Sequence, residues 1–191
     1  MKEETINSVL DKGTEIVLSK GFNNVGINEV LETVGIPKGS FYYYFDSKED
    51  FGLQLIDRYS KKSLETLKRF LEDDSKNPKE RILGFYLHMR NHYQQKNYRE
   101  GCLLGNCSLE LSDLKESYSK KIASALEEWE DVFVKCIEEG QAMGNIQNVM
   151  ESRKLAGFML NNWEGALLRM KATKSPKPLD IFIEFTEKLL S

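Results

Sequence analysis

Apolar side chains recur every three or four residues along most of this chain, which is the period of an α-helix rather than a β-strand. The first such stripe, within residues 3–20, consists of Ile6, Val9, Leu10, Gly13, Ile16 and Val17. Further helices are predicted over residues 27–34, 37–44, 47–71, 78–97, 102–113, 115–141, 152–172 and 178–190. The pattern therefore predicts an all-α fold.

Residues that favour helix ends stand between these stretches. Gly21 and Gly35 follow the first two helices, at a position where glycine is favoured because the backbone often turns left-handed there. Pro37 stands near the first turn of the third helix, where its missing N–H costs little. Ser47 is a suitable N-cap for the fourth helix. Residues 72–78 break the pattern and predict a short connection.

Residues 26–48 contain two short helices joined by a turn at Gly35. This is the helix-turn-helix layout, in which the second helix enters the major groove of DNA. Phe41 and Phe45 have a four-residue spacing and are expected to face inward, which turns the three tyrosines at 42–44 largely outward. Exposed neighbouring aromatic side chains are unfavourable unless they meet a partner.

DNA offers a contact to each outward residue of this second helix. Lys38 can donate to guanine, Ser40 can contact either kind of base pair, and a tyrosine ring can meet a thymine methyl. Gly39 lets the backbone come close, and tyrosine hydroxyls can donate to phosphates. Lys48, at the start of the following helix, can hold another phosphate because a helix N-terminus attracts anions.

Charge argues in the other direction. The net charge of the chain is −3, and residues 1–50 contain five lysines against nine acidic residues. A DNA-binding protein usually has a basic surface, so the prediction depends on individual lysines. We expect weak non-specific binding to DNA for the same reason.

Other sequence features narrow the class of protein. No run of 18 apolar residues exists, and the chain starts with polar and acidic residues, so we expect a cytoplasmic protein without membrane contact. Cys102, Cys107 and Cys136 are odd in number and show no paired spacing. This argues against disulfides and a zinc site, and we expect no cofactor.

The residues KGF at 20–22, IPKGSFYYYF at 36–45 and SKE at 47–49 resemble the DNA-binding domain of the TetR family of bacterial repressors. The resemblance implies a homodimer that binds a palindromic DNA operator and is released by a small-molecule inducer. It implies a DNA-binding domain at 1–46 and a ligand-binding and dimerisation domain at 47–191.

By the same resemblance, the residues that contact bases are Lys38, Gly39, Ser40 and Tyr43. Those that contact the DNA backbone are Tyr42, Tyr44, Lys48, Ile27 and Asn28. Gly26 departs from the family, which usually has Ser or Thr capping the second helix. Glycine is an acceptable N-cap but supplies no hydroxyl, so one phosphate contact is missing.

The last two predicted helices carry more bulky apolar side chains than one short chain can bury, which favours a four-helix interface between two copies. The residues predicted for it are Leu155, Phe158, Met159, Leu167, Phe182, Phe185 and Leu189. An ordinary core within one chain is the alternative.

Residues 101–114 and 163–179 resemble a branch of the family that includes the repressor of N-ethylmaleimide reductase, which senses electrophiles and oxidants. The match aligns Cys102 with a reactive cysteine and Lys171 with its lysine partner. Cys102 is expected at a helix start, where a thiolate is favoured. The alternatives are a buried structural cysteine, a lysine that caps its helix, and an inducer that binds without covalent chemistry.

His88 and His92 share one helix face, as metal-binding pairs do, but no third ligand is fixed by spacing. We therefore expect no metal, and expect the two histidines to line an inducer pocket or the surface, together with Tyr86, Tyr93 and Trp163.

Two other functions remain as alternatives. An enzyme with Cys102 as nucleophile lacks an evident acid or orienting partner, so we expect no enzymatic activity. A helical partner-binding module without DNA binding would fit the acidic balance of the first 50 residues.

Overall fold

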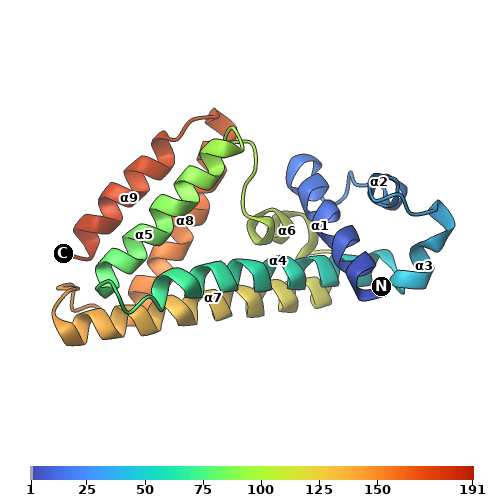
Figure 1. Cartoon of the computed structure of the whole chain (residues 1–191). Helices are drawn as coiled ribbons and strands as arrows, with labels where there is room; N and C mark the ends of the chain where they lie inside the picture. The colour runs from blue at the N-terminus through green and yellow to red at the C-terminus, as the bar shows by residue number, and fades with distance from the viewer. Residues whose placement is uncertain (1) are drawn as a thin grey trace. The chain divides into compact units, whose positions relative to one another are not determined.

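The computed structural model describes residues 2–191, and the predicted all-helical fold is confirmed there (Figure 1). The helices of the N-terminal part are α1 (Lys2–Lys20), α2 (Ile27–Thr33), the 3-10 helix η1 (Lys38–Ser40), α3 (Phe41–Tyr44) and α4 (Lys48–Leu71). They are followed by α5 (Pro78–Gln95), α6 (Leu103–Leu111), α7 (Glu116–Met143), α8 (Ser152–Thr173) and α9 (Lys177–Leu189). Across residues 2–191, no helix is both long and apolar enough to span a bilayer.

The helix ends confirm the local signals in the sequence. Gly21 and Gly35 have φ angles of 82° and 71°, in the left-handed region that favours glycine. The hydroxyl oxygen of Ser47 accepts the backbone N–H of Asp50 at 3.0 Å, which caps the start of α4. The third predicted helix differs in detail, because its first turn is the 3-10 helix η1 and only Phe41–Tyr44 are α-helical.

The chain divides into two compact units. The first consists of Met1–Lys62 and Cys102–Ala125, and the second of Ser63–Gly101 and Leu126–Ser191. Residues of α4 and α7 therefore fall in both units. These units group residues by packing, whereas the predicted boundary at residue 46 divides the chain by function. That boundary therefore stays a prediction.

The first unit has a core in which α1 approaches α4 closely. A Cβ atom on Gly13 of α1 would lie 2.8 Å from Cζ of Phe51 on α4, so only a glycine fits without a shift. Val9, Leu55 and Ile56 are fully buried around this contact. The close approach fixes the direction of α1 relative to the start of α4.

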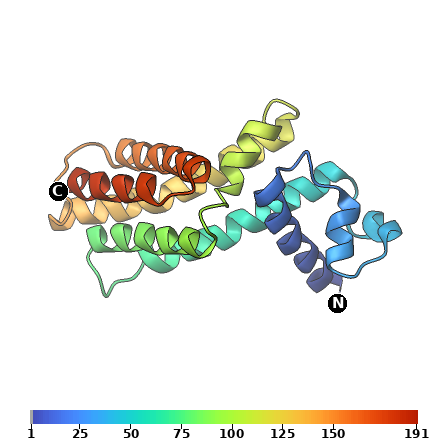
Figure 2. The same ribbon diagram turned by 90° about the horizontal axis from the view of Figure 1, so that it is seen from above.

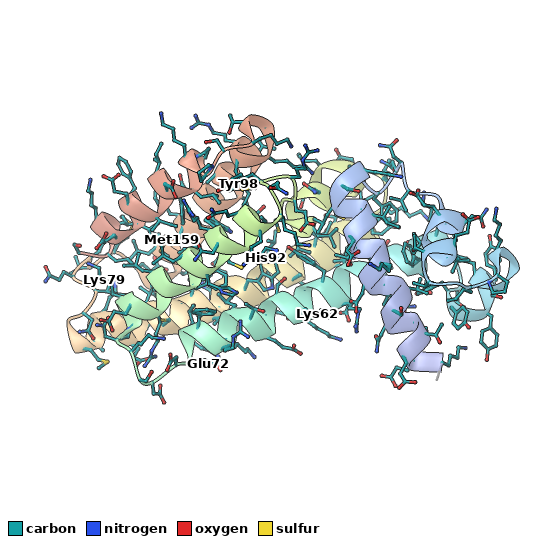
Figure 3. The ribbon with its side chains drawn as sticks, turned by 45° about the horizontal axis from the view of Figure 1, so that its top comes forward. Lys62, Glu72, Lys79, His92, Tyr98 and Met159 are labelled. Atoms are coloured by element: carbon teal, nitrogen blue, oxygen red, sulfur yellow. The ribbon has the colours of Figure 1, made fainter. Side chains whose placement is uncertain are left out.

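An ionic network fastens the same two helices at their outer side. The Arg58 guanidinium on α4 donates to both carboxylate oxygens of Asp11 on α1, at 2.8 and 2.9 Å, and to the side-chain oxygen of Asn7 at 2.6 Å. Lys62, labelled on α4 in Figure 3, donates to Asp11 at 2.6 Å. Arg58 holds the pKa of Asp11 down at about 2.

In the second unit, α8 and α9 lie side by side and α5 contacts α9 (Figure 2). The turn before α5 is held by Arg81, which is 4% exposed. Its guanidinium donates to the carbonyl oxygen of Lys76 and to the carboxylates of Asp74 and Glu139. The predicted break at 72–78 is therefore a fixed turn inside the second unit.

Replacing Asp11 by Asn is expected to lower the free energy of unfolding by about 1 kcal/mol at neutral pH, after allowance for solvent screening of a partly exposed group. Because the folded pKa lies below the unfolded value of 3.8, this stability is present above pH 3.8 and is lost as the pH falls towards 2. Urea unfolding between pH 7 and pH 2 should show the two proteins converging.

Glu15→Gln is the matched control, since Glu15 pairs with its neighbour Lys12 on the surface of α1. An equal loss of stability in the control would mean that the Asp11 network contributes nothing of its own.

Candidate nucleic-acid interface and sensor site

The second helix of the helix-turn-helix is held by aromatic rings. Phe41 and Phe45 are 4% and 1% exposed, as their spacing predicted. The Phe41 ring lies 5.3 Å from that of Phe45 and 6.2 Å from that of Phe51 on α4, and Phe51 in turn stacks on Phe22 at 6.5 Å. We call Phe22, Phe41, Phe45 and Phe51 the head cluster. It fixes which side of the helix faces the solvent.

The tyrosines between the two phenylalanines are not buried in the head cluster, although the Tyr42 ring meets the Phe41 ring edge to face at 5.3 Å. Tyr42 and Tyr43 are 77% and 64% exposed, and Tyr44 is half-buried. The rings of Tyr43 and Tyr44 pack edge to face at 5.0 Å, and the Lys2 ammonium lies 4.4 Å above the Tyr43 ring. This arrangement brings two phenol rings of one short segment together with a cation of α1.

Lys38 and Gly39 open the same segment. The Lys38 ammonium pairs with the Glu32 carboxylate of α2 at 2.8 Å, which raises the pKa of Lys38. A Cβ on Gly39 would meet no atom of the described chain within 4 Å, so the fold itself does not require glycine here. Ser40 is half-buried beside them. A partner that approaches the backbone closely would account for the glycine.

The starts of α2 and α4 carry the other residues that were predicted to contact the DNA backbone. Gly26 is the N-cap of α2 and contributes no side-chain hydrogen bond; Ile27 is half-buried and Asn28 is exposed. The exposed Lys48 ammonium donates to the carbonyl oxygen of Val25 at 3.4 Å and lies 5.3 Å from the Phe22 ring. That contact is long enough to be exchanged for a phosphate.

Sequence reasoning missed two residues at this surface. Glu32 neutralises Lys38 across the turn, and Lys2 lies over Tyr43 although more than 40 positions separate them in the chain. Helix periodicity carries no signal for either contact, because both depend on how α1 and α2 pack around the head cluster.

The residues predicted for an inducer site differ in their burial. Tyr86 and Trp163 are buried, with their ring centres 4.9 Å apart. His88 is exposed with its ring 4.8 Å from that of Phe70, and His92 is half-buried near the end of α5 (Figure 3). Burial lowers the pKa of His92. Within residues 2–191, no group of three or more His, Cys, Asp or Glu is arranged to hold a metal ion.

The cysteines are all buried. Burial raises the pKa of Cys107 and of Cys136 to about 12, so both act as core residues, as the sequence predicted. Cys102 is 4% exposed and is the N-cap of α6 in the first unit, whereas Lys171 is half-buried on α8 in the second unit. Their pairing stays a prediction.

An open groove of about 660 Å³ runs along the outer face of α8 and α9. Its walls include Phe158, Asn162, Gly165, Ile181, Phe182, Phe185 and Leu189. Phe158 and Phe185 are 56% and 64% exposed. Leu155 and Leu167, in contrast, are buried in the core of the single chain, and Met159 is buried at the floor of the groove. Of the residues predicted for the interface between copies, Phe158, Met159, Phe182, Phe185 and Leu189 therefore line the groove, and Leu155 and Leu167 do not.

Two family models match the chain. The model described as bacterial regulatory proteins, tetR family, matches residues 9–55. The model described as tetracyclin repressor-like, C-terminal domain, matches residues 78–186. The first match contains the helix-turn-helix and the second contains α5 to most of α9.

Among curated proteins, the chain is 34% identical over 175 residues to the HTH-type transcriptional repressor DhaR of Mycobacterium sp. (strain GP1), covering 92% of this chain and 86% of DhaR. It is 28% identical over 190 residues to the HTH-type transcriptional repressor NemR of Escherichia coli (strain K12), covering 100% and 96%.

Solved structures agree over the whole chain. A regulatory protein TetR from Rhodobacter sphaeroides is 32% identical with a TM-score of 0.91, covering 97% of this chain and 98% of that one. The reduced form of E. coli NemR is 29% identical with a TM-score of 0.90, covering 98% of both chains.

Replacing Glu32 by Gln should raise the affinity of this surface for DNA by about twofold to fivefold, because Lys38 no longer has to leave its exposed ion pair with Glu32 when it contacts DNA. The change is measured by fluorescence anisotropy with a labelled duplex. We call residues 38–44 the reading segment; Glu15→Gln removes the same charge on α1, outside this segment, and is the control. Equal gains in both variants would show that net charge alone matters.

Proposed function

The chain belongs to the TetR family of bacterial regulatory proteins, and on that premise we propose that it is a transcriptional repressor. It binds a palindromic operator as a homodimer in the cytoplasm and is released by a small-molecule inducer.

The observation that carries this proposal is the exposed face of the segment Lys38–Tyr44. Tyr42 and Tyr43 are its most exposed large side chains, while Phe41 and Phe45 hold it from behind. Rings and hydroxyls turned to solvent on a fixed helix suit base edges and phosphates. Gly39, which no contact within the chain requires, suits the close approach of a duplex.

The charges of the first unit support binding through specific contacts. Lys20 and Lys38 each pair with a glutamate of the same unit, which lowers the free positive charge of this unit. Affinity for arbitrary DNA comes mainly from unpaired cations that displace counterions. Base contacts and Lys48 at the start of α4 therefore supply most of the operator affinity.

The groove on α8 and α9 supports the homodimer. Its exposed apolar side chains lie on two neighbouring helices, and pairing with the same two helices of a second copy gives a four-helix interface. Gly165 faces the groove with open space around it, which allows a partner helix to come close. Two reading segments on one dimer then match the two halves of a palindrome.

A thiol sensor acting through Cys102 is a second candidate, favoured by the position of Cys102 at the start of α6 and by the similarity to NemR. Its burial means that a reagent must first open the site. Cys102→Ser separates the two candidates, because release by a non-covalent inducer survives this change and release by an electrophile does not.

Wild-type protein should bind at least one duplex from the region upstream of its own gene, with an affinity that falls log-linearly as salt is raised. Tyr43→Ala should weaken this binding by about 30-fold or more, since each half-site loses a contact worth about 1 kcal/mol or more. Anisotropy titrations at two salt concentrations measure both effects.

Leu114→Ala is the control for that titration, because Leu114 is 61% exposed in the same unit but outside the reading segment. Unchanged operator affinity in Tyr43→Ala would contradict the assignment of the reading segment. DNA binding without salt dependence would contradict phosphate contacts altogether.

Phe185→Glu should convert the dimer to a monomer in sedimentation experiments, because each copy would lose an apolar contact and bury a carboxylate beside Phe158 and Ile181 of the groove. Leu109→Glu is the control, since Leu109 is an 80% exposed apolar residue of α6 outside the groove. The proposed interface is wrong if Phe185→Glu remains dimeric at concentrations where the control does.

A further inference from the structure

Two side-chain polar atoms of residues 2–191 are buried without a hydrogen-bond partner, the hydroxyl of Tyr86 and Oδ1 of Asn145, and only the first lies among aromatic rings. Tyr86 is fully buried on α5, and its hydroxyl oxygen has no hydrogen-bond partner among the described residues. Leaving a buried hydroxyl unpaired destabilises a folded protein, and most buried polar groups are paired for that reason. A phenylalanine would fill the same space without this cost, so the hydroxyl calls for a partner from outside the chain.

Aromatic rings surround Tyr86 on several sides. Phe133 of α7 stacks on it at 5.6 Å with 15° between the planes, and Trp163 of α8 lies at 4.9 Å. Phe182 of α9 meets it edge to face at 4.7 Å, and Phe85 of α5 lies at 5.3 Å. Flat apolar walls with one polar group are the usual lining of a small-molecule site. Such walls select a flat molecule.

The charge of that molecule follows from the surroundings of the hydroxyl. Burial, and then the negative charge of Glu164, raise the pKa of Tyr86 well above its ordinary value, so the hydroxyl keeps its proton and can donate it in a hydrogen bond. A charged ligand would lose its hydration among the four rings, and the negative charge of Glu164 further disfavours an anion. An uncharged molecule with an acceptor oxygen fits best.

Phe182 connects this position with the groove on α8 and α9. Its ring contacts Tyr86 and also forms part of the groove wall. Because the rings touch, a ligand must take the place of one of them, and Phe182 is the one of the four that also lines the groove. Movement of Phe182 would alter the surface proposed to bind the second copy.

We propose that Tyr86 is the hydrogen-bond donor of the inducer site, and that the inducer is an uncharged, planar molecule with one acceptor oxygen, bound between the rings of Phe133, Trp163 and Phe182. This rests on the proposed repressor function and assigns its ligand class. The inducer binds without forming a covalent bond, and its insertion displaces Phe182.

Three probes with the same two-ring skeleton test the ligand class by calorimetry: 1-indanone, which has a carbonyl oxygen; indane, which lacks it; and 1-aminoindane, which carries a positive charge. We expect 1-indanone to bind the wild-type protein about threefold to tenfold more tightly than indane, the range given by one net hydrogen bond. We expect 1-aminoindane to bind more weakly than either.

Tyr86→Phe is the decisive variant. It should bind 1-indanone no more tightly than indane, while the free variant unfolds at a higher temperature than wild type because the unpaired hydroxyl is gone. Tyr118→Phe is the matched control: Tyr118 is also buried, but its hydroxyl donates to the carbonyl oxygen of Glu49 at 3.4 Å in the first unit. The control should lose stability and keep the preference for 1-indanone.

The proposal is overturned if 1-indanone does not bind, if it binds Tyr86→Phe as tightly as wild type, or if 1-aminoindane binds best, which would indicate a cation site instead. Anisotropy with operator DNA keeps this result separate from the repressor function. Ligand binding that depends on Tyr86 in a protein without DNA binding would leave the site intact and refute the repressor. Specific DNA binding that 1-indanone leaves unchanged would refute the inducer class alone.

Discussion

The position of the reading segment depends on two phenylalanine rings, Phe41 and Phe45, which face the core while the neighbouring tyrosines face the solvent. An α-helix of four residues after a single 3-10 turn has too few hydrogen bonds to persist by itself in water. Phe41 and Phe45 supply what the backbone lacks, because their burial against Phe51 fixes both the position and the rotation of the helix. The exposure of Tyr42 and Tyr43 is a consequence of that anchoring, and so are the contacts that the reading segment is proposed to make with DNA.

The acidic first unit makes recognition an exchange of partners. Lys38 is paired with Glu32 before any duplex arrives, and Lys48 already donates to the carbonyl oxygen of Val25. A phosphate or guanine must therefore replace an existing contact rather than fill a free one. Such exchange lowers affinity for every sequence alike, and only correct base contacts restore it. The arrangement thereby favours specificity over tight binding.

Local signals in the sequence were sufficient for most of the fold and for the reading segment. The glycines at helix ends, the Ser47 cap and the buried pair Phe41 and Phe45 each depend on a few neighbouring residues. Residue type and spacing therefore predict them. The burial of the side chains on α8 was harder to predict. Leu155 and Met159 are buried and Phe158 is exposed, although all three fit the same helical period. Periodicity cannot say which stripe faces the core. Nor can it reveal a tyrosine whose hydroxyl lacks a partner, since that depends on packing among three other helices.

Phe182 gives the two proposals for the second unit a common physical basis. Its ring lies against Tyr86 on one side and forms part of the groove on the other, so a ligand and a second copy of the chain both depend on its position. Coupling between two binding events is reciprocal. If the ligand favours a position of the Phe182 ring that the second copy disfavours, each one lowers the binding affinity of the other by the same factor. A ligand bound equally well by both positions could not act as an inducer by this route, however tightly it bound. The sensor therefore requires a ligand that moves the Phe182 ring. A molecule that stacks on Phe133 without reaching the Tyr86 hydroxyl could bind without moving Phe182.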